Sequence, residues 1–138
     1  MATFKKFEDI KAWQKARNLN KILGVYVDEG RFKNSYKLIS QIEGSAGSIM
    51  DNIAEGFERN GNKEFIQFLY ISKGSCGEFR SQLYRALDRK FLNQIEFDAL
   101  YSQAMEVIVM IQKLIDYLIT SEHKGTKFKN RDREVHET

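Results

Sequence analysis

Proline is absent from all 138 residues of this chain, and this absence constrains the fold more than any other feature. A proline inside a helix costs about 3 kcal/mol, because its ring clashes with the preceding turn and a backbone hydrogen bond is lost. The chain can therefore form long uninterrupted helices. Its 42% hydrophobic and 30% charged residues are typical of one folded globular domain.

Four segments carry apolar residues at spacings of three and four, which is the period of an amphipathic helix. The segments span residues 8–27, 35–58, 63–89 and 94–120. Helices of this length with short connections predict an all-α, up-down-up-down antiparallel four-helix bundle. Residues 121–138 have no such period and are predicted to be a flexible charged tail.

The turns between these segments have recognisable signals. Gly30 is a natural helix stop, and the stretch 60–62 reads Asn-Gly-Asn. Asn93 with Glu96 forms a capping box before the fourth helix.

The sequence offers no group suited to catalysis. Cys76 is the single cysteine, so no disulfide can form within the chain, which is typical of the reducing cytoplasm. His123 and His136 lie in the predicted tail, where they neither form a di-iron Glu-x-x-His motif nor activate Cys76. No apolar run approaches the roughly 20 residues of a membrane span. We therefore expect a cytoplasmic, non-enzymatic protein with no catalytic residue, metal, cofactor, small-molecule substrate or membrane contact.

Glycines interrupt the second and third helices at positions 44, 47, 74 and 77. Each costs roughly 1 kcal/mol relative to alanine inside a helix. One interpretation is a close backbone approach between these two helices. The other is a pocket or a backbone surface for a ligand.

The second helix ends in a group of acidic residues. Asp51 and Glu55 are four residues apart and repel one another on one helix face. They also oppose the helix dipole. We expect Arg80 or Arg85 of the third helix to pair with them in a salt-bridge network, and a ligand-binding acidic site is the alternative.

The sequence of this chain, including the end of the second helix, resembles the bacterial four-helix-bundle proteins encoded in intervening sequences of 23S ribosomal RNA genes. The resemblance covers about residues 4–120. The matching residues are Gln41-Ile42 through Ser48-Ile49, Asn52-Ile53-Ala54-Glu55-Gly56, Arg59, Phe65, Phe68-Leu69, Gly74-Ser75, Glu78, Phe7-Glu8-Asp9-Ile10, Trp13 and Ala16.

This resemblance implies a four-helix bundle. The family has relatives associated with retroelements, the accessory variability determinants. These relatives look like homopentamers, and their basic surface binds nucleic acid. The resemblance thus implies a pentamer of this chain and RNA or DNA as partners. The signature does not fix the basic residues, so a nucleic-acid site cannot be transferred residue by residue.

Helix 8–27 carries a candidate nucleic-acid-binding arc. On a helical wheel Arg17 and Lys21 face away from the apolar stripe, and Lys11 and Lys15 flank it. Such an arc suits phosphates. A plain solvated face is the alternative.

A second stripe on helix 63–89 lies roughly opposite its apolar face. It consists of Tyr70, Lys73, Gly77, Arg80 and Tyr84. Aromatic and cationic side chains can grip RNA, but Tyr and Arg are also enriched at subunit interfaces. We favour an interface through Tyr70, Arg80 and Tyr84.

The fourth helix favours self-association. Residues 107–111 are apolar on every side, which predicts burial on both sides of the helix. We expect Val109 and Met110 to lie at a homo-oligomer interface. The sequence thus predicts an oligomeric scaffold that binds RNA or other nucleic acid, and the alternative is a protein-binding or structural oligomer with no nucleic-acid role.

Overall fold

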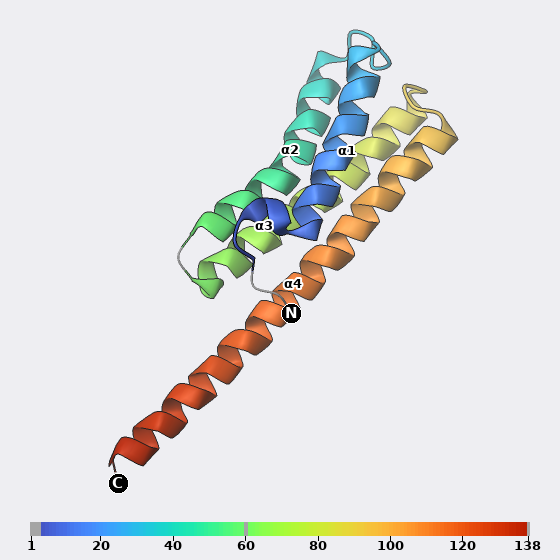
Figure 1. The fold of residues 1–138 in the computed structure, drawn as a ribbon. Coiled ribbons are helices and arrows are strands. Elements are labelled where there is room, and N and C mark those ends of the chain that lie inside the picture. The colour runs from blue at the N-terminus through green and yellow to red at the C-terminus, as the bar shows by residue number, and fades with distance from the viewer. Residues whose placement is uncertain (1–3, 60, 138) are drawn as a thin grey trace.

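Four long helices and one short 3-10 helix make up the chain (Figure 1). The computed structural model describes the backbone of residues 4–59 and 61–137 and the side chains of 4–59 and 61–121. The elements are η1 (Phe7–Asp9), α1 (Lys11–Asp28), α2 (Tyr36–Glu58), α3 (Asn62–Asp88) and α4 (Gln94–Glu137).

The helices are arranged as a four-membered ring. Both α1 and α3 pack against α2 and α4. Successive helices run in opposite directions, and α4 continues past the ends of the other three (Figure 1). The predicted all-α architecture of four packed helices is confirmed.

Two helix boundaries differ from the predicted ones. The first helix, expected from residue 8, begins at Lys11, because Ile10 is extended and separates η1 from α1. The fourth helix, expected to end near residue 120, continues as α4 to Glu137. The sequence predicts a flexible tail over residues 121–138. Apart from Ser121, the side chains of this segment lie outside the described residues.

The core follows the predicted stripes, and residues of both loops at one end complete it. Phe32 of the α1–α2 loop is fully buried, and its ring centroid lies 5.6 Å from that of Phe91 in the α3–α4 loop. Leu92 is also buried. This end of the bundle is therefore closed by apolar loop residues.

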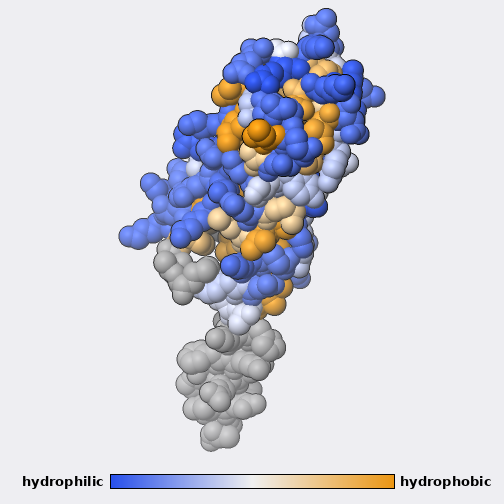
Figure 2. All heavy atoms as spheres, turned by 90° about the vertical axis from the view of Figure 1, so that its right-hand side faces the viewer, coloured by the Kyte–Doolittle hydropathy of each residue, from blue (hydrophilic) through white to orange (hydrophobic). Residues whose placement is uncertain are grey.

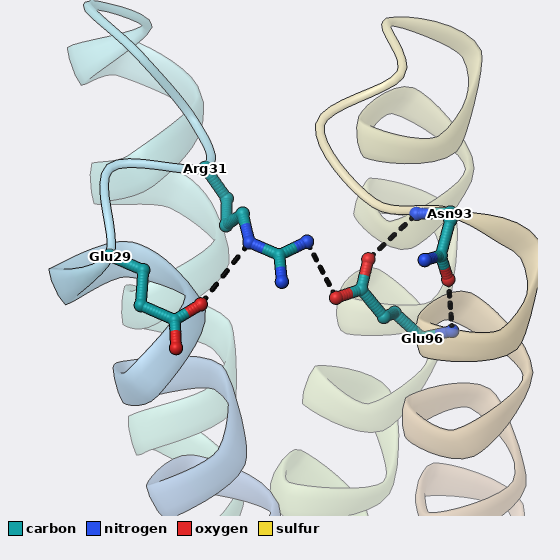
Figure 3. Close-up of polar contacts among 4 residues, drawn as sticks. All are labelled: Glu29, Arg31, Asn93 and Glu96. Atoms are coloured by element: carbon teal, nitrogen blue, oxygen red, sulfur yellow. Dashed lines mark hydrogen bonds and ion pairs between the residues drawn. The ribbon is translucent and has the colours of Figure 1, made fainter.

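An ion pair joins the same two loops. The Arg31 guanidinium lies 2.6 Å from the Glu96 carboxylate and 3.2 Å from that of Glu29 (Figure 3). The predicted capping box is confirmed, since the Glu96 amide donates to Asn93 Oδ1 at 2.8 Å and the Asn93 amide donates to Glu96 Oε1 at 2.9 Å. Glu96 therefore caps α4 and pairs with the α1–α2 loop at once.

Serines hold α2 against α3. Ser45 donates to Gln82 Oε1 at 2.5 Å, the Ser48 and Ser75 hydroxyls lie 2.8 Å apart, and Ser72 donates to the Ile49 carbonyl at 2.7 Å. These small side chains let the two backbones approach closely.

The predicted role of the helix glycines in this approach is wrong. A Cβ added at Gly44, Gly74 or Gly77 would meet nothing within 4 Å, and at Gly47 it would meet only the Asp51 carboxylate, at 3.9 Å. The glycine that packing does require is Gly56, where an added Cβ would lie 2.6 Å from the Phe68 Cβ. The four interior glycines thus face away from their neighbours in the described part of the chain.

Candidate interaction surfaces

The first candidate surface is the outer side of α1. Lys11, Arg17 and Lys21 are exposed, and Arg17 lies over the Trp13 ring, 5.8 Å from its centroid. Lys15 differs, because it is half-buried and forms an ion pair with Glu106 of α4. The structure thus separates Lys15 from the other three predicted cations.

Those three cations have no acidic partner among the described side chains. The ion pairs found there involve Lys15, Arg31 and Arg59. Arg17 and Lys21 are one helical turn apart, so their side chains are neighbours on the surface. This part of α1 can approach phosphates without breaking an intramolecular ion pair.

The second candidate surface is the outer edge between α3 and α4. Tyr84 packs on Phe97, with ring centroids 4.9 Å apart, and meets Tyr101 edge-on at 5.9 Å. Arg80 donates from Nη2 to the Tyr101 hydroxyl at 2.8 Å. Lys73 donates to Gln112 Oε1 at 2.7 Å.

The predicted second stripe of α3 therefore faces α4 rather than lying opposite the core. Its tyrosines are only partly covered, since Tyr70 is 49% exposed and Tyr84 is 50% exposed. A helical wheel gives the direction in which a side chain leaves the helix axis, but it does not show which neighbouring helix covers that direction. The sequence pattern therefore does not show that this stripe lies next to α4.

Hydrophobic residues of α4 are also exposed. Met105 is 38% exposed and Val109 49% exposed. Met110, expected beside Val109 at the interface, is half-buried and packs against the core. Figure 2 shows the right-hand side of Figure 1, where hydrophobic side chains interrupt a hydrophilic surface.

Arg80 has an unusual environment within this edge. Its guanidinium lies over the Tyr101 ring, 5.0 Å from the centroid, while its Nε is buried and has no hydrogen-bond partner. No described carboxylate is within ion-pair distance of it. The hydrogen bond from Arg80 lowers the pKa of Tyr101.

Cys76 lies near Arg80 but is not suited to nucleophilic chemistry. The thiol is fully buried, and burial raises its pKa to about 12. It therefore stays protonated and unreactive at neutral pH. The predicted interpretation of Cys76 as a small buried hydrophobic residue fits this environment.

The acidic residues of α2 do not find the partners predicted for them. Arg85 donates to Gln41, at 2.8 Å, and Glu55 pairs with Arg59 one turn away, at 3.0 Å. Glu43 and Asp51 are exposed, and neither has an ion-pair partner within the described ranges. The acidic face of α2 and the cations of α3 therefore do not neutralise each other inside one chain.

Open pockets lie at both ends of the bundle. One pocket of about 630 Å³ is lined by loop residues that include Arg31, Lys33 and Lys90. Another, of about 340 Å³, is lined by residues that include Phe57, Arg59 and Tyr117. Within the described residues, no group of three or more His, Cys, Asp or Glu side chains could hold a metal ion, and no helix is long and apolar enough to span a membrane.

Comparison with known proteins identifies relatives of this fold. The sequence model described as "23S rRNA-intervening sequence protein" matches residues 8–113. A crystal structure of a protein of unknown function from the S23 ribosomal protein family of Bacteroides thetaiotaomicron is similar, with a TM-score of 0.69 and 18% identity. The match covers 75% of this chain and 97% of that one. No curated protein matches the chain.

Proposed function

Because this chain belongs to the 23S rRNA-intervening sequence protein family, we propose that it is a non-enzymatic, self-associating scaffold that binds nucleic acid, foremost RNA. The observation that carries this proposal is the exposed, unpaired set of cations on α1, namely Lys11, Arg17 and Lys21, within the described residues. The chain also resembles the accessory variability determinants, which look like homopentamers that bind nucleic acid. This resemblance supports both self-association and nucleic-acid binding.

The expected mode of binding is electrostatic. Cations on a helix exterior contact phosphates without reading bases, so affinity depends on counterion release and little on sequence. Trp13 beside Arg17 is half-buried, meets Phe7 edge-on and packs against the core, so it supports Arg17 and is not an open stacking surface. Structured RNA and duplex DNA are therefore both expected to bind through their phosphates.

The test is fluorescence anisotropy with a structured RNA and a DNA duplex at several salt concentrations. We expect micromolar or tighter binding that weakens steeply with salt. Arg17→Glu/Lys21→Glu should abolish most of the binding. The matched control is Lys37→Glu/Lys63→Glu, which changes the net charge equally at exposed positions on other helices.

Two results would contradict the proposal. One is no binding even at low salt, and the other is an equal loss of affinity in both charge-reversal variants. The exposed Tyr70, Tyr84 and Val109 would then favour the second candidate function, a structural or protein-binding oligomer with no nucleic-acid role. An apolar interface of that kind depends only weakly on salt.

A further inference from the structure

The pocket at the loop end of the bundle lies apart from the cations of α1. It has a volume of about 630 Å³, and both loops at this end line it, with Arg31 and Lys33 from the α1–α2 loop and Lys90 from the α3–α4 loop. We propose that this pocket binds a phosphate monoester, either the terminal phosphate of a nucleic acid or that of a small phosphorylated molecule. Such a site goes beyond the function proposed above, because it uses none of the α1 cations.

Buried contacts between the two loops fix the walls of this pocket. The rings of Phe32 and Phe91 pack with centroids 5.6 Å apart, and both side chains are buried. The ion pair of Arg31 with Glu96 crosses from one loop to the first turn of α4 (Figure 3). Because the walls are held in place before a ligand arrives, little conformational entropy is lost on binding.

The charge available in the pocket is positive. Of the described residues that line it, Glu96 alone is acidic, and its carboxylate already accepts the Asn93 amide and pairs with Arg31. Lys33 and Lys90 are exposed and have no ion-pair partner among the described side chains. Their two ammonium groups match a phosphate monoester, whose charge at neutral pH is about −1.5 to −2. An internal phosphodiester carries a single charge and is the poorer match.

Both lysines occupy a backbone conformation that favours glycine. The φ angle is +53° at Lys33 and +63° at Lys90. A side chain is unfavourable there, because its Cβ comes too close to a backbone carbonyl oxygen. Since both residues are exposed, packing of their side chains does not offset this cost.

The ends of α1 and α3 show what the fold itself requires at position 90. Both helices end in the same C-terminal motif, in which two successive amides donate to carbonyls three and five residues earlier. The donors are Gly30 and Arg31 after α1, and Lys90 and Phe91 after α3. Glycine takes the left-handed position of the motif after α1, whereas lysine takes it after α3. Backbone geometry thus favours glycine at position 90, and contact with a bound anion gives the lysine a role.

The backbone around the pocket also favours an anion. The lining residue Asn93 directly precedes α4, and the amides at the start of a helix carry partial positive charge. The last carbonyls of α1 and α3 would repel an anion, but the two C-terminal motifs engage them in hydrogen bonds. The helix ends at this pocket therefore add to the attraction of its lysines.

The experiment measures the melting temperature of the full chain while inorganic phosphate replaces chloride at constant ionic strength. We expect a saturable rise, because a ligand that binds the folded state stabilises it. Lys33→Gln/Lys90→Gln should weaken phosphate binding by about tenfold or more, since each lysine supplies a charge-assisted hydrogen bond. Lys63→Gln/Lys113→Gln removes the same charge at exposed positions on α3 and α4 and should bind phosphate like the original.

A second pair of changes separates binding from folding. Lys33→Gly/Lys90→Gly places glycine at both left-handed positions, so the melting temperature without phosphate should rise while the effect of phosphate is lost. The absence of a saturable rise in the original chain would overturn the proposal. So would an equal rise in the original and in Lys33→Gln/Lys90→Gln.

Short RNAs with a 5′-phosphate or a 5′-hydroxyl identify the source of the phosphate. Tighter binding of the 5′-phosphorylated RNA than of inorganic phosphate, lost in Lys33→Gln/Lys90→Gln, would assign a nucleic-acid terminus. Inorganic phosphate binding at least as tightly would assign a small phosphorylated molecule. Arg17→Glu/Lys21→Glu should keep the effect of phosphate, and Lys33→Gln/Lys90→Gln should still bind duplex DNA that lacks terminal phosphates. Failure of this site is therefore distinguishable from failure of the α1 surface.

Discussion

The Arg31 guanidinium lies 2.6 Å from the Glu96 carboxylate and thereby joins the α1–α2 loop to the first turn of α4. The Glu96 side chain is only 11% exposed, whereas that of Arg31 is 40% exposed. The carboxylate also accepts the Asn93 amide, at 2.9 Å. One acidic group thus serves a helix cap and a tertiary contact.

Replacing this glutamate should destabilise the bundle. Glu96→Ala removes the reciprocal cap and leaves Arg31 without its closer carboxylate, so the free energy of unfolding should fall by about 1–2 kcal/mol. Glu64→Ala, in the first turn of α3, is the matched control and should change it by less than about 0.5 kcal/mol. Urea unfolding measures both, and equal effects would contradict the dual role of Glu96.

Gly56 and Gly24 should respond in opposite directions to the same substitution. Gly56→Ala places a Cβ 2.6 Å from that of Phe68, and such overpacking costs about 1–3 kcal/mol. At Gly24 an added Cβ meets nothing within 4 Å, so Gly24→Ala should stabilise by about 0.5–1 kcal/mol. Denaturant midpoints of the two variants provide the comparison, and a stable Gly56→Ala protein would show that α2 and α3 are less tightly packed.

Replacing one partner of the hydrogen bond between Ser45 and Gln82 should lower the stability of the fold more than replacing both partners. Ser45→Ala leaves the buried Gln82 amide without its partner, which should cost about 1–3 kcal/mol. Adding Gln82→Met replaces that amide by an apolar group and should recover part of the loss. Thermal unfolding measures both variants, with Ser81→Ala as an exposed control. If the double variant is no more stable than Ser45→Ala alone, the bond contributes little.

Cys76 should be protected from thiol reagents in the folded protein. Burial raises its pKa from 9.0 to about 12, so the thiolate is scarce at pH 8. A chromogenic disulfide should react slowly in buffer and rapidly in urea, with one thiol per chain. Rapid reaction of the folded chain would mean that Cys76 is accessible.

The same raised pKa predicts a loss of stability at alkaline pH. Between pH 9 and about 12 the unfolded thiol ionises while the folded thiol stays protonated, so the unfolded state binds fewer protons and stability falls as pH rises. The decline attributable to this group approaches about 1.4 kcal/mol per pH unit. Cys76→Ala should lack that component, and identical pH profiles for the two proteins would contradict it.

Much of the fold could be predicted because its causes are local. The apolar spacing in each helix, the Gly30 stop and the box of Asn93 with Glu96 are short-range patterns that tertiary packing did not override. The break at Ile10 is not visible in the sequence pattern, since apolar residues on both sides continue the helical period. Nothing in the pattern distinguished Phe32 and Phe91 as buried loop residues.

The candidate surfaces were predictable only in part. Exposure of Lys11, Arg17 and Lys21 follows from the wheel of a single helix. The wheel groups Lys15 with them, because the pairing of Lys15 with Glu106 depends on which helix lies alongside α1. The partners of Arg80 depend in the same way on the neighbour of α3. Contacts between distant segments need the three-dimensional arrangement, which helical periodicity does not contain.

The serine contacts between α2 and α3 have a consequence for how this sequence can change over evolution. Apolar contacts are not directional, whereas the bonds that join Ser45 to Gln82, Ser48 to Ser75 and Ser72 to the Ile49 carbonyl form at one alignment of the helices only. A shift by one turn would break all three bonds and leave the buried Ser72 hydroxyl and the buried Gln82 amide without these partners. Core residues can therefore drift in size among hydrophobic types while these few polar atoms preserve the alignment of the pair.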